Sequence, residues 1–146
     1  MKIYKKKINI ESKSQIEFID ITNQVEDVIS TSGIREGQVL VYSPHTTMSI
    51  AVNHNEPMLI RDFVKILYKI APIDDQYSHD LFELRRDKKT DGRSNGHSHC
   101  KTLMMGISET IPVEKGKMMI TGRQAVFAID FDGARKRELI IQVIGF

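Results

Sequence analysis

The sequence has only one cysteine, Cys100, and this excludes an internal disulfide framework. It also contains no paired-cysteine zinc motif, no glycine-rich nucleotide-binding loop and no serine-nucleophile elbow. A free cysteine most often behaves as a small apolar group, so we expect Cys100 to be buried and inert. Because it directly follows His99, the alternative is a thiolate nucleophile or a soft metal ligand.

Excess charge and long apolar runs are also missing. The formal net charge is +2 over 146 residues, which gives no reason to expect nucleic acid or an anionic membrane as a partner. No apolar stretch approaches the length of a membrane span, so the expected compartment is the cytoplasm. The basic runs at residues 5–7 and 135–137 have no interleaved aromatic side chains, and they predict solvated strand edges or turns.

The composition, with 40% hydrophobic and 27% charged residues, is that of an ordinary globular protein. We therefore expect a single domain over residues 1–146. Thr22 has a hydroxyl that can cap a first helix, Gly33 can end it in a left-handed conformation, and Pro57 suits the first position of a second helix. Apolar spacing of about 3.6 residues then predicts helices over residues 22–33, 57–71 and 98–108.

Period-two alternation and β-branched residues predict about eight strands around these helices. The last two, over residues 124–131 and 138–144, flank Asp132-Gly133 and are expected to pair as a hairpin. The strands and helices do not alternate as they do in a parallel α/β protein. The predicted fold class is therefore α+β, with a mainly antiparallel, sandwich-like sheet and two or three helices. The polar stretch at residues 73–97 is expected to be a functional loop or lid.

Groups that can hold a metal or move a proton are concentrated at residues 91–99. His97 and His99 are two apart, so in a helix they face opposite sides, although at a loop-to-helix junction both can converge on one ion. His45 lies at a break between two strands, where its ring can enter a pocket. Because neutral imidazole suits zinc and similar ions, His45, His97 and His99 are the candidate metal ligands. The alternative for His97 and His99 is that they cap or hydrogen-bond the helix start.

Other polar residues are candidates for acid–base chemistry or substrate binding. Glu56 and Asp91 are plausible acid–base groups, and a helix cap or a turn is the alternative for each. His79 lies in the polar stretch, where an exposed loop histidine is an equally good reading. Arg123 can hold a phosphate or carboxylate through two hydrogen bonds, and the alternative is a surface arginine.

Taken together, these segments resemble the YjbQ family of small proteins, described as secondary thiamine-phosphate synthase enzymes. The similar positions run in order over almost the whole chain. They comprise His45-Thr46-Thr47, Asn53 with Asn55-Glu56-Pro57, Tyr77-x-His79, Asp91-Gly92, Asn95-Gly96-His97-Ser98-His99, Gly106, Ile111-Pro112-Val113-Glu114-x-Gly116, Gln124, Asp132-Gly133-x-Arg135 and Gln142-Val143-Ile144-Gly145.

The resemblance implies an α+β fold built on antiparallel sheet, a homotrimer, and a histidine-rich pocket that can hold a divalent metal. It implies roles for His45 and His99 in particular, and adds Asn53, Asn95 and Gln124 to Arg123 as candidate substrate-binding residues. Relatives often carry Asp at the position of His97. A metal-ligand position can exchange imidazole for carboxylate in this way, so the resemblance implies a ligand role for His97. Relatives usually read Gly-Thr-Trp-Gln where this chain reads Thr121-Gly122-Arg123-Gln124, and this chain has no tryptophan. Arg123 would make the site more cationic.

Three functions are consistent with these features. The first is thiamine-phosphate synthesis, which joins a hydroxymethylpyrimidine diphosphate to a thiazole phosphate and needs a divalent cation for the departing diphosphate. Magnesium prefers oxygen ligands, so an all-histidine site suits zinc better and favours the second function, a metal-dependent hydrolase or lyase of a small anionic or phosphorylated metabolite. The third is a non-catalytic trimer that binds a metal or a small ligand.

Overall fold

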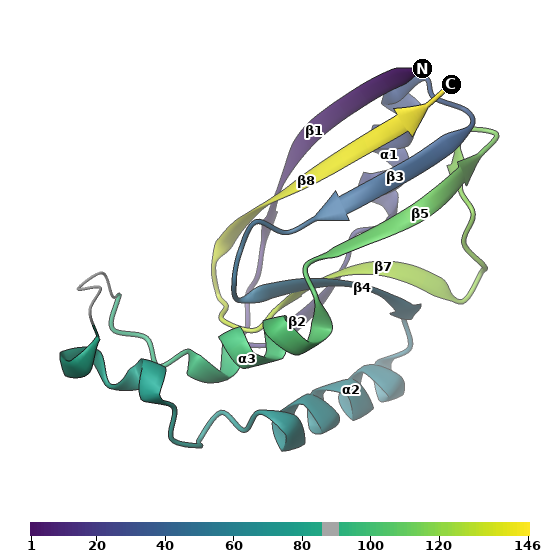
Figure 1. Cartoon of the computed structure of the whole chain (residues 1–146). Coiled ribbons are helices and arrows are strands. Elements are labelled where there is room, and N and C mark those ends of the chain that lie inside the picture. Colours follow the sequence, from purple (N-terminus) through teal and green to yellow (C-terminus); the bar gives the residue numbers. More distant parts are fainter. Residues whose placement is uncertain (86–90) are drawn as a thin grey trace.

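The computed structural model describes residues 1–85 and 91–146. In these residues the chain forms two antiparallel sheets and three α-helices (Figure 1). The larger sheet has the strand order β1-β8-β3-β5-β6 and the smaller one β2-β7-β4, which confirms the predicted α+β class. The strands are β1 (Lys2–Glu11), β2 (Glu17–Asp20), β3 (Gly37–Tyr42), β4 (Met48–His54), β5 (Ser108–Glu114), β6 (Lys117–Met118), β7 (Gln124–Asp130) and β8 (Lys136–Gly145); the helices are α1 (Thr22–Ser32), α2 (Pro57–Ile70) and α3 (Gly96–Met105).

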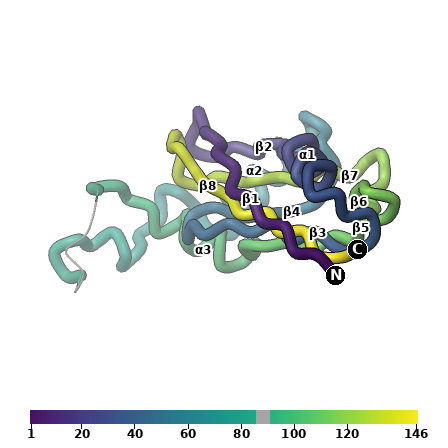
Figure 2. Tube along the Cα trace, turned by 90° about the horizontal axis from the view of Figure 1, so that it is seen from above, coloured from purple at the N-terminus to yellow at the C-terminus, as the bar shows by residue number. Residues whose placement is uncertain are grey.

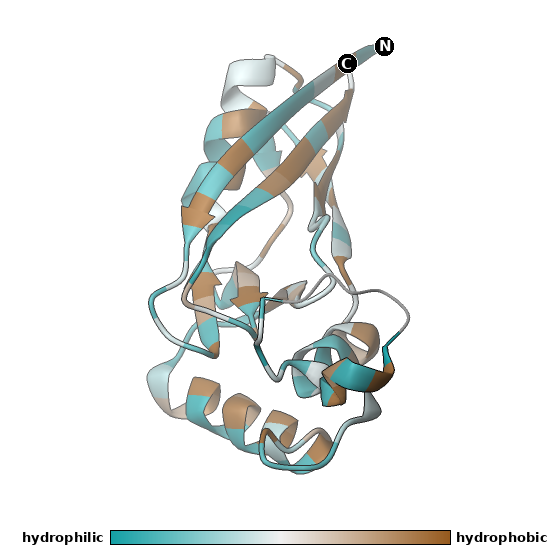
Figure 3. Ribbon diagram, turned by 90° about the vertical axis from the view of Figure 1, so that its left-hand side faces the viewer, coloured by the Kyte–Doolittle hydropathy of each residue, from teal (hydrophilic) through white to brown (hydrophobic). Residues whose placement is uncertain are grey.

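One main core lies against the larger sheet and α1. Alternate residues of β8 are buried, including Leu139, Ile141 and Val143, and they meet Val25 and Ile29 of α1 in the same apolar cluster. This alternation is what a sheet with one covered face requires. A second, smaller cluster joins Leu67 of α2 to the outer face of the small sheet. Figure 3 shows apolar bands along α2 and α3 at the end of the molecule away from the termini.

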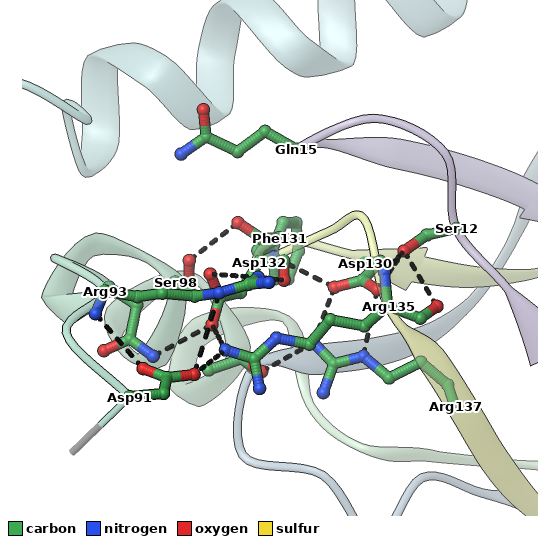
Figure 4. Close-up of polar contacts among 12 residues, drawn as sticks. Ser12, Gln15, Asp91, Arg93, Ser98, Asp130, Phe131, Asp132, Arg135 and Arg137 are labelled. Carbon is green, nitrogen blue, oxygen red and sulfur yellow. Dashed lines mark hydrogen bonds and ion pairs between the residues drawn. The ribbon is translucent and has the colours of Figure 1, made fainter.

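The predicted hairpin at Asp132-Gly133 is wrong. Strand β7 pairs with β2 and β4, whereas β8 pairs with β1 and β3, so the turn carries the chain from one sheet to the other. A buried ion pair holds this crossing, because Arg137 Nη2 lies 2.7 Å from Asp130 Oδ1 (Figure 4). Arg137 is therefore buried, against the prediction of a solvated basic run, while the lysines at residues 5–7 are exposed on an edge strand as predicted.

The ends of the helices differ from the predictions in two places. Ile21 occupies the cap position of α1, and the Thr22 hydroxyl instead donates to Asp20 Oδ1 at 2.6 Å and accepts from the Val126 amide. Gly33 does end α1 in the left-handed conformation, with φ 69°. Helix α3 begins at Gly96, before the predicted start at residue 98, so His97 and His99 both lie inside it.

The described residues between α2 and α3, 71–85 and 91–95, lie to one side of the sheets (Figure 2). It contains two short 3₁₀ turns, η1 (Ser78–Asp80) and η2 (Phe82–Leu84). The predicted loop or lid at residues 73–97 falls partly outside the described residues, since 86–90 are not among them. No helix in residues 1–85 and 91–146 is long and apolar enough to cross a membrane.

Candidate functional site

His45 and His99 line the same pocket, which has a volume of about 400 Å³. His45 comes from the connection between β3 and β4, and His99 from α3. On α3 the lining residues are His99, Thr102 and Leu103, which lie three and four residues apart on one face of the helix, and Gly106 at the C-cap follows them. The fold thus brings together two histidines that are far apart in the sequence.

The ring of His45 is fixed by the backbone of β8. Its Nε2 lies 3.0 Å from the carbonyl oxygen of Glu138 and 3.1 Å from the amide nitrogen of the same residue. Burial, followed by the positive charge of Arg137, lowers the pKa of His45 below its usual value. His45 is therefore a neutral, oriented imidazole at pH 7.

His99 is in contact with a third histidine. The ring centroids of His79 and His99 are 4.6 Å apart in an edge-to-face arrangement. Burial, and then the charge of His79, lowers the pKa of His99. The charge of Asp132 and a hydrogen bond to the Thr46 backbone oppose the shift, and the charge of Arg85 adds a smaller lowering. His99 is consequently neutral at pH 7. The ring contact places His79 beside His99, so the three histidines lie at the same end of the molecule.

Gly96 allows η1 to approach α3 closely enough for this histidine contact. A Cβ atom at Gly96 would lie 2.5 Å from Cβ of Tyr77, a separation that side-chain carbons do not tolerate. The Gly96 amide donates a hydrogen bond to Asp80 Oδ1 at 3.0 Å. Asp80 and His79 belong to the same 3₁₀ turn, so this contact sets the position of His79 against His99.

His97 is completely buried and interacts with Lys101, outside the group of residues that line the pocket. The Lys101 ammonium donates to His97 Nδ1 at 2.8 Å and to the Ala71 carbonyl at 2.6 Å. Burial and the Lys101 charge lower the pKa of His97 to about 4, and burial lowers that of Lys101 to about 8. A carboxylate at position 97 would be placed to accept the same hydrogen bond from Lys101.

The three candidate metal ligands are therefore not brought to one point. Within residues 1–85 and 91–146, no three His, Cys, Asp or Glu side chains are grouped closely enough to hold an ion. Nδ1 of His97 is occupied by Lys101, and Nε2 of His45 is engaged by Glu138. A site of His45, His97 and His99 does not fit this arrangement.

The two predicted acid–base carboxylates have structural partners. Glu56 caps α2 by accepting from the amides of Met58 and Leu59 at 3.0 and 2.7 Å, and these bonds lower its pKa. Asp91 accepts from the Arg93 amide, which lowers its pKa, and pairs with Arg135 at 2.6 Å (Figure 4). The structure thus gives Glu56 the role of a helix cap and Asp91 that of a turn residue, the alternatives that the sequence offered. Neither carboxylate lines the pocket of His45 and His99.

Asn95 lies near the predicted histidine site, but it belongs to the same polar network as Asp91 and Arg135. Its amide donates to Asp132 Oδ2 at 2.9 Å, and Arg135 Nη2 reaches the same oxygen at 3.0 Å. Asp132 is buried and was not among the predicted site residues, although the Asp132-Gly133 turn was noted. These contacts tie the start of α3 to the crossing between the sheets.

The remaining predicted substrate-binding residues lie at the opposite end of β4. Arg123 and Gln124 line a separate polar pocket of about 480 Å³ together with His54 and Asn55. Asn53 lines an apolar cavity between α2 and the small sheet. His45 precedes β4 and Asn55 follows it, and a strand of 7 residues spans roughly 20 Å. The predicted site residues thus form two groups.

The structure changes the interpretation of two further residues of the α3 segment. Cys100 is exposed, so the prediction of a buried thiol is wrong. Thr102 is buried and lines the histidine pocket, although the sequence analysis did not select it. Thr102 lies three residues after His99, which places both residues on the same face of a helix. A correct prediction of where α3 begins would therefore have pointed to Thr102.

Comparison with known proteins places the chain in a family. The model of the family described as UPF0047 protein YjbQ-like matches residues 6–146. This chain belongs to that family. A UPF0047 protein of Methanothermobacter thermautotrophicus is 32% identical over 145 residues, covering 99% of this chain and 94% of that protein. A UPF0047 protein of Archaeoglobus fulgidus is 33% identical over 137 residues, covering 94% and 98%.

Solved structures of the YjbQ-like family share the fold. A YbjQ-like protein of unknown function from Sulfolobus solfataricus superposes with a TM-score of 0.89 at 28% identity, covering 99% of both chains. A YjbQ/UPF0047 family protein from Clostridium acetobutylicum, described as uncharacterised, gives a TM-score of 0.83 at 32% identity, covering 94% of this chain and 98% of that one. The resemblance noted from the motifs is confirmed at the level of the family.

Proposed function

We propose that this protein is an enzyme that acts on a small anionic or phosphorylated metabolite in the pocket lined by His45 and His99. The observation that carries the proposal is the convergence of these two imidazoles, each with a lowered pKa, on one pocket of about 400 Å³. A neutral imidazole can accept a proton from a substrate or a water and return it later, as general acid–base catalysis requires.

The charges near the pocket have both signs. Arg137 lowers the pKa of His45 and Arg85 lowers that of His99, whereas Asp130 and Glu138 raise the first and Asp132 raises the second. The anionic character of the proposed substrate therefore rests on the family resemblance and not on these charges.

Thiamine-phosphate synthesis is the specific reaction that we propose to test first. It follows from the resemblance of the motifs to proteins described as secondary thiamine-phosphate synthases. Its two substrates both carry phosphate, in keeping with the proposed anionic substrate. The departing diphosphate would need compensation by a bound cation or by cationic side chains.

A divalent metal, most simply zinc, is a further part of the proposal and supports the second candidate, a hydrolase or lyase. Nitrogen ligands favour zinc over magnesium, and the proposal of zinc rests on the histidine-rich pocket that the family resemblance implies. We also propose, from the family resemblance, that the protein is a homotrimer, which light scattering of the purified protein tests.

The assay is to incubate the purified protein with hydroxymethylpyrimidine diphosphate and thiazole phosphate, with magnesium, with zinc, or with a chelator. We expect thiamine phosphate and diphosphate to form, and His99→Gln to lower the rate by roughly 100-fold. The matched control is His54→Gln, because His54 lines the other polar pocket. Hydrolysis of either substrate alone in the presence of zinc would favour the second candidate, and ligand binding with no turnover of any kind would favour a non-catalytic binding protein.

A further inference from the structure

The connection from β3 to β4 leaves the main chain of β8 without a partner from β3, and His45 takes that place. Strand β3 ends at Tyr42, which pairs with Ile140 of β8. Continued by two residues, the same register would put Pro44 opposite Glu138, and proline has no N–H to donate. Nε2 of His45 lies instead 3.0 Å from the carbonyl oxygen of Glu138 and 3.1 Å from its amide nitrogen. The imidazole thus covers the part of β8 that β3 no longer reaches.

One ring nitrogen cannot satisfy both main-chain groups at the same time. A neutral imidazole carries one proton, so Nε2 either donates to the Glu138 carbonyl or accepts from the Glu138 amide. In the first case Nδ1 has a free lone pair, and in the second case Nδ1 carries the proton. Because Glu138 offers a hydrogen-bond partner to either form, its backbone stabilises both tautomers of His45.

The second ring nitrogen of His45, Nδ1, is open to solvent. The side chain is half-buried, and Nδ1 has no hydrogen-bond partner within residues 1–85 and 91–146. It is also not one of the buried polar atoms that lack a partner in that part of the chain, so it has accessible surface. His45 lines the pocket that it shares with His99, and a ligand in this pocket would meet Nδ1.

We infer that His45 contacts the substrate through Nδ1, and that the backbone of Glu138 is a positioning group that lets Nδ1 act as an acceptor or as a donor. The inference rests on the proposed function, because it takes the same pocket as the substrate site, and it narrows the class of substrate. The group that meets Nδ1 carries a proton in one state of the reaction and lacks it in another, as a hydroxyl, an amine or a bound water does. A group that is an acceptor throughout would need only one of the two tautomers.

The competing explanation is that His45 is structural and only replaces the missing partner of Glu138. Two substitutions separate these roles. The amide of His45→Gln reaches about as far as Nε2 and can still donate to and accept from Glu138, whereas the amide of His45→Asn reaches only about as far as Nδ1. We expect His45→Gln to melt close to wild type and His45→Asn to melt roughly 3 to 5 °C lower. Both should turn over hydroxymethylpyrimidine diphosphate and thiazole phosphate roughly 100-fold more slowly.

A reagent that needs no affinity for the pocket identifies the open nitrogen. Diethyl pyrocarbonate is added at about pH 8, where imidazole is neutral. The lone pair of Nδ1 attacks a carbonyl carbon of the reagent and forms an N–C bond, Nε2 loses its proton, and the ethyl carbonate that leaves breaks down to ethanol and carbon dioxide. In the adduct Nε2 can accept from the Glu138 amide.

We expect peptide mass spectrometry to find His45 modified and nitrogen NMR to place the new group on Nδ1. Nitrogen NMR of the unmodified protein should show both tautomers of His45. His54 is the matched reference, because it is also half-buried and lines the other polar pocket.

Modification of His45 on Nε2, no modification of His45 while His54 reacts, or a single tautomer of His45 in either form would overturn the inference. So would turnover at the wild-type rate in His45→Gln. Thermal melts of each variant show whether it is folded. Because the reagent and the NMR spectra need no turnover, the expected adduct in a protein with no activity would remove the proposed enzyme and leave Nδ1 of His45 as a ligand-contacting atom.

Discussion

His97 and His99 lie two residues apart on α3, and the helix gives them different surroundings. His99 lines the pocket and touches His79, whereas His97 accepts from the buried ammonium of Lys101. Both have lowered pKa values, but only His99 is placed to meet a ligand. The spacing in the sequence allowed both outcomes, because it depended on whether the helix began before or after His97.

The buried imidazole of His97 makes stability depend on pH. Its pKa is about 4 in the folded chain and about 6.5 when unfolded, so between these values the unfolded state binds more protons. The free energy of unfolding should therefore fall as the pH drops from about 6.5 to 4, by up to about 3 kcal/mol. Urea unfolding of wild type and His97→Asn at pH 7 and 4.5 measures this. Equal losses of stability in the two proteins would contradict it.

A carboxylate at position 97 should act on Lys101. In His97→Asp the new side chain can accept from the ammonium that now bonds Nδ1 of His97. An opposite charge favours the protonated form of a buried lysine, so the pKa of Lys101 should rise above its present value of about 8. An NMR titration of the Lys101 side chain gives the value directly, and a pKa at or below 8 in the variant would show that the two groups do not pair.

At the scale of elements, the start of α2 depends on Glu56. Its carboxylate accepts from two amides of the first turn, and Pro57 follows at the first helical position. Glu56→Ala should lower the melting temperature by roughly 3 to 5 °C, and Glu56→Gln by less, because the amide oxygen can still accept. Turnover should be affected little in either variant. A large loss of turnover in Glu56→Gln with an unchanged melting temperature would instead assign Glu56 to the chemistry.

The close approach of η1 to α3 depends on Gly96. In Gly96→Ala the added carbon meets Tyr77, so the turn that carries His79 must move away from His99. We expect turnover to fall roughly ten-fold or more, with a lower melting temperature. Gly122→Ala is the matched control, because a Cβ atom at Gly122 meets nothing within 4 Å. Equal activity of both variants would show that the contact of His79 with His99 has no part in the reaction.

Local features of the sequence predicted most of the helices and strands, but they predicted fewer of the pairings between strands. Gly33 and Pro57 marked an end and a start of helices correctly, because the conformations that these residues favour are local properties. The hairpin at Asp132-Gly133 was wrong because pairing depends on which sheet each strand joins, and Arg137 gave no local sign of its buried bond to Asp130. Likewise, the sequence brought out His45 and His99, but only the fold separates them from Arg123.

At the scale of the whole molecule, β4 separates two pockets that lie at its opposite ends. One holds His45 and His99, and the other holds His54, Arg123 and Gln124. The central claim is that the first pocket is the reaction site. Its neutral imidazoles support that choice, whereas Arg123 and Gln124 of the second pocket are exposed.

The most direct test follows the imidazole nitrogens of all 5 histidines by NMR while hydroxymethylpyrimidine diphosphate is added. We predict that the signals of His45, His79 and His99 shift together with one dissociation constant, and that those of His54 and His97 stay unchanged. A shift of His54 with no change at His99 would contradict the account and move the site to the pocket of Arg123.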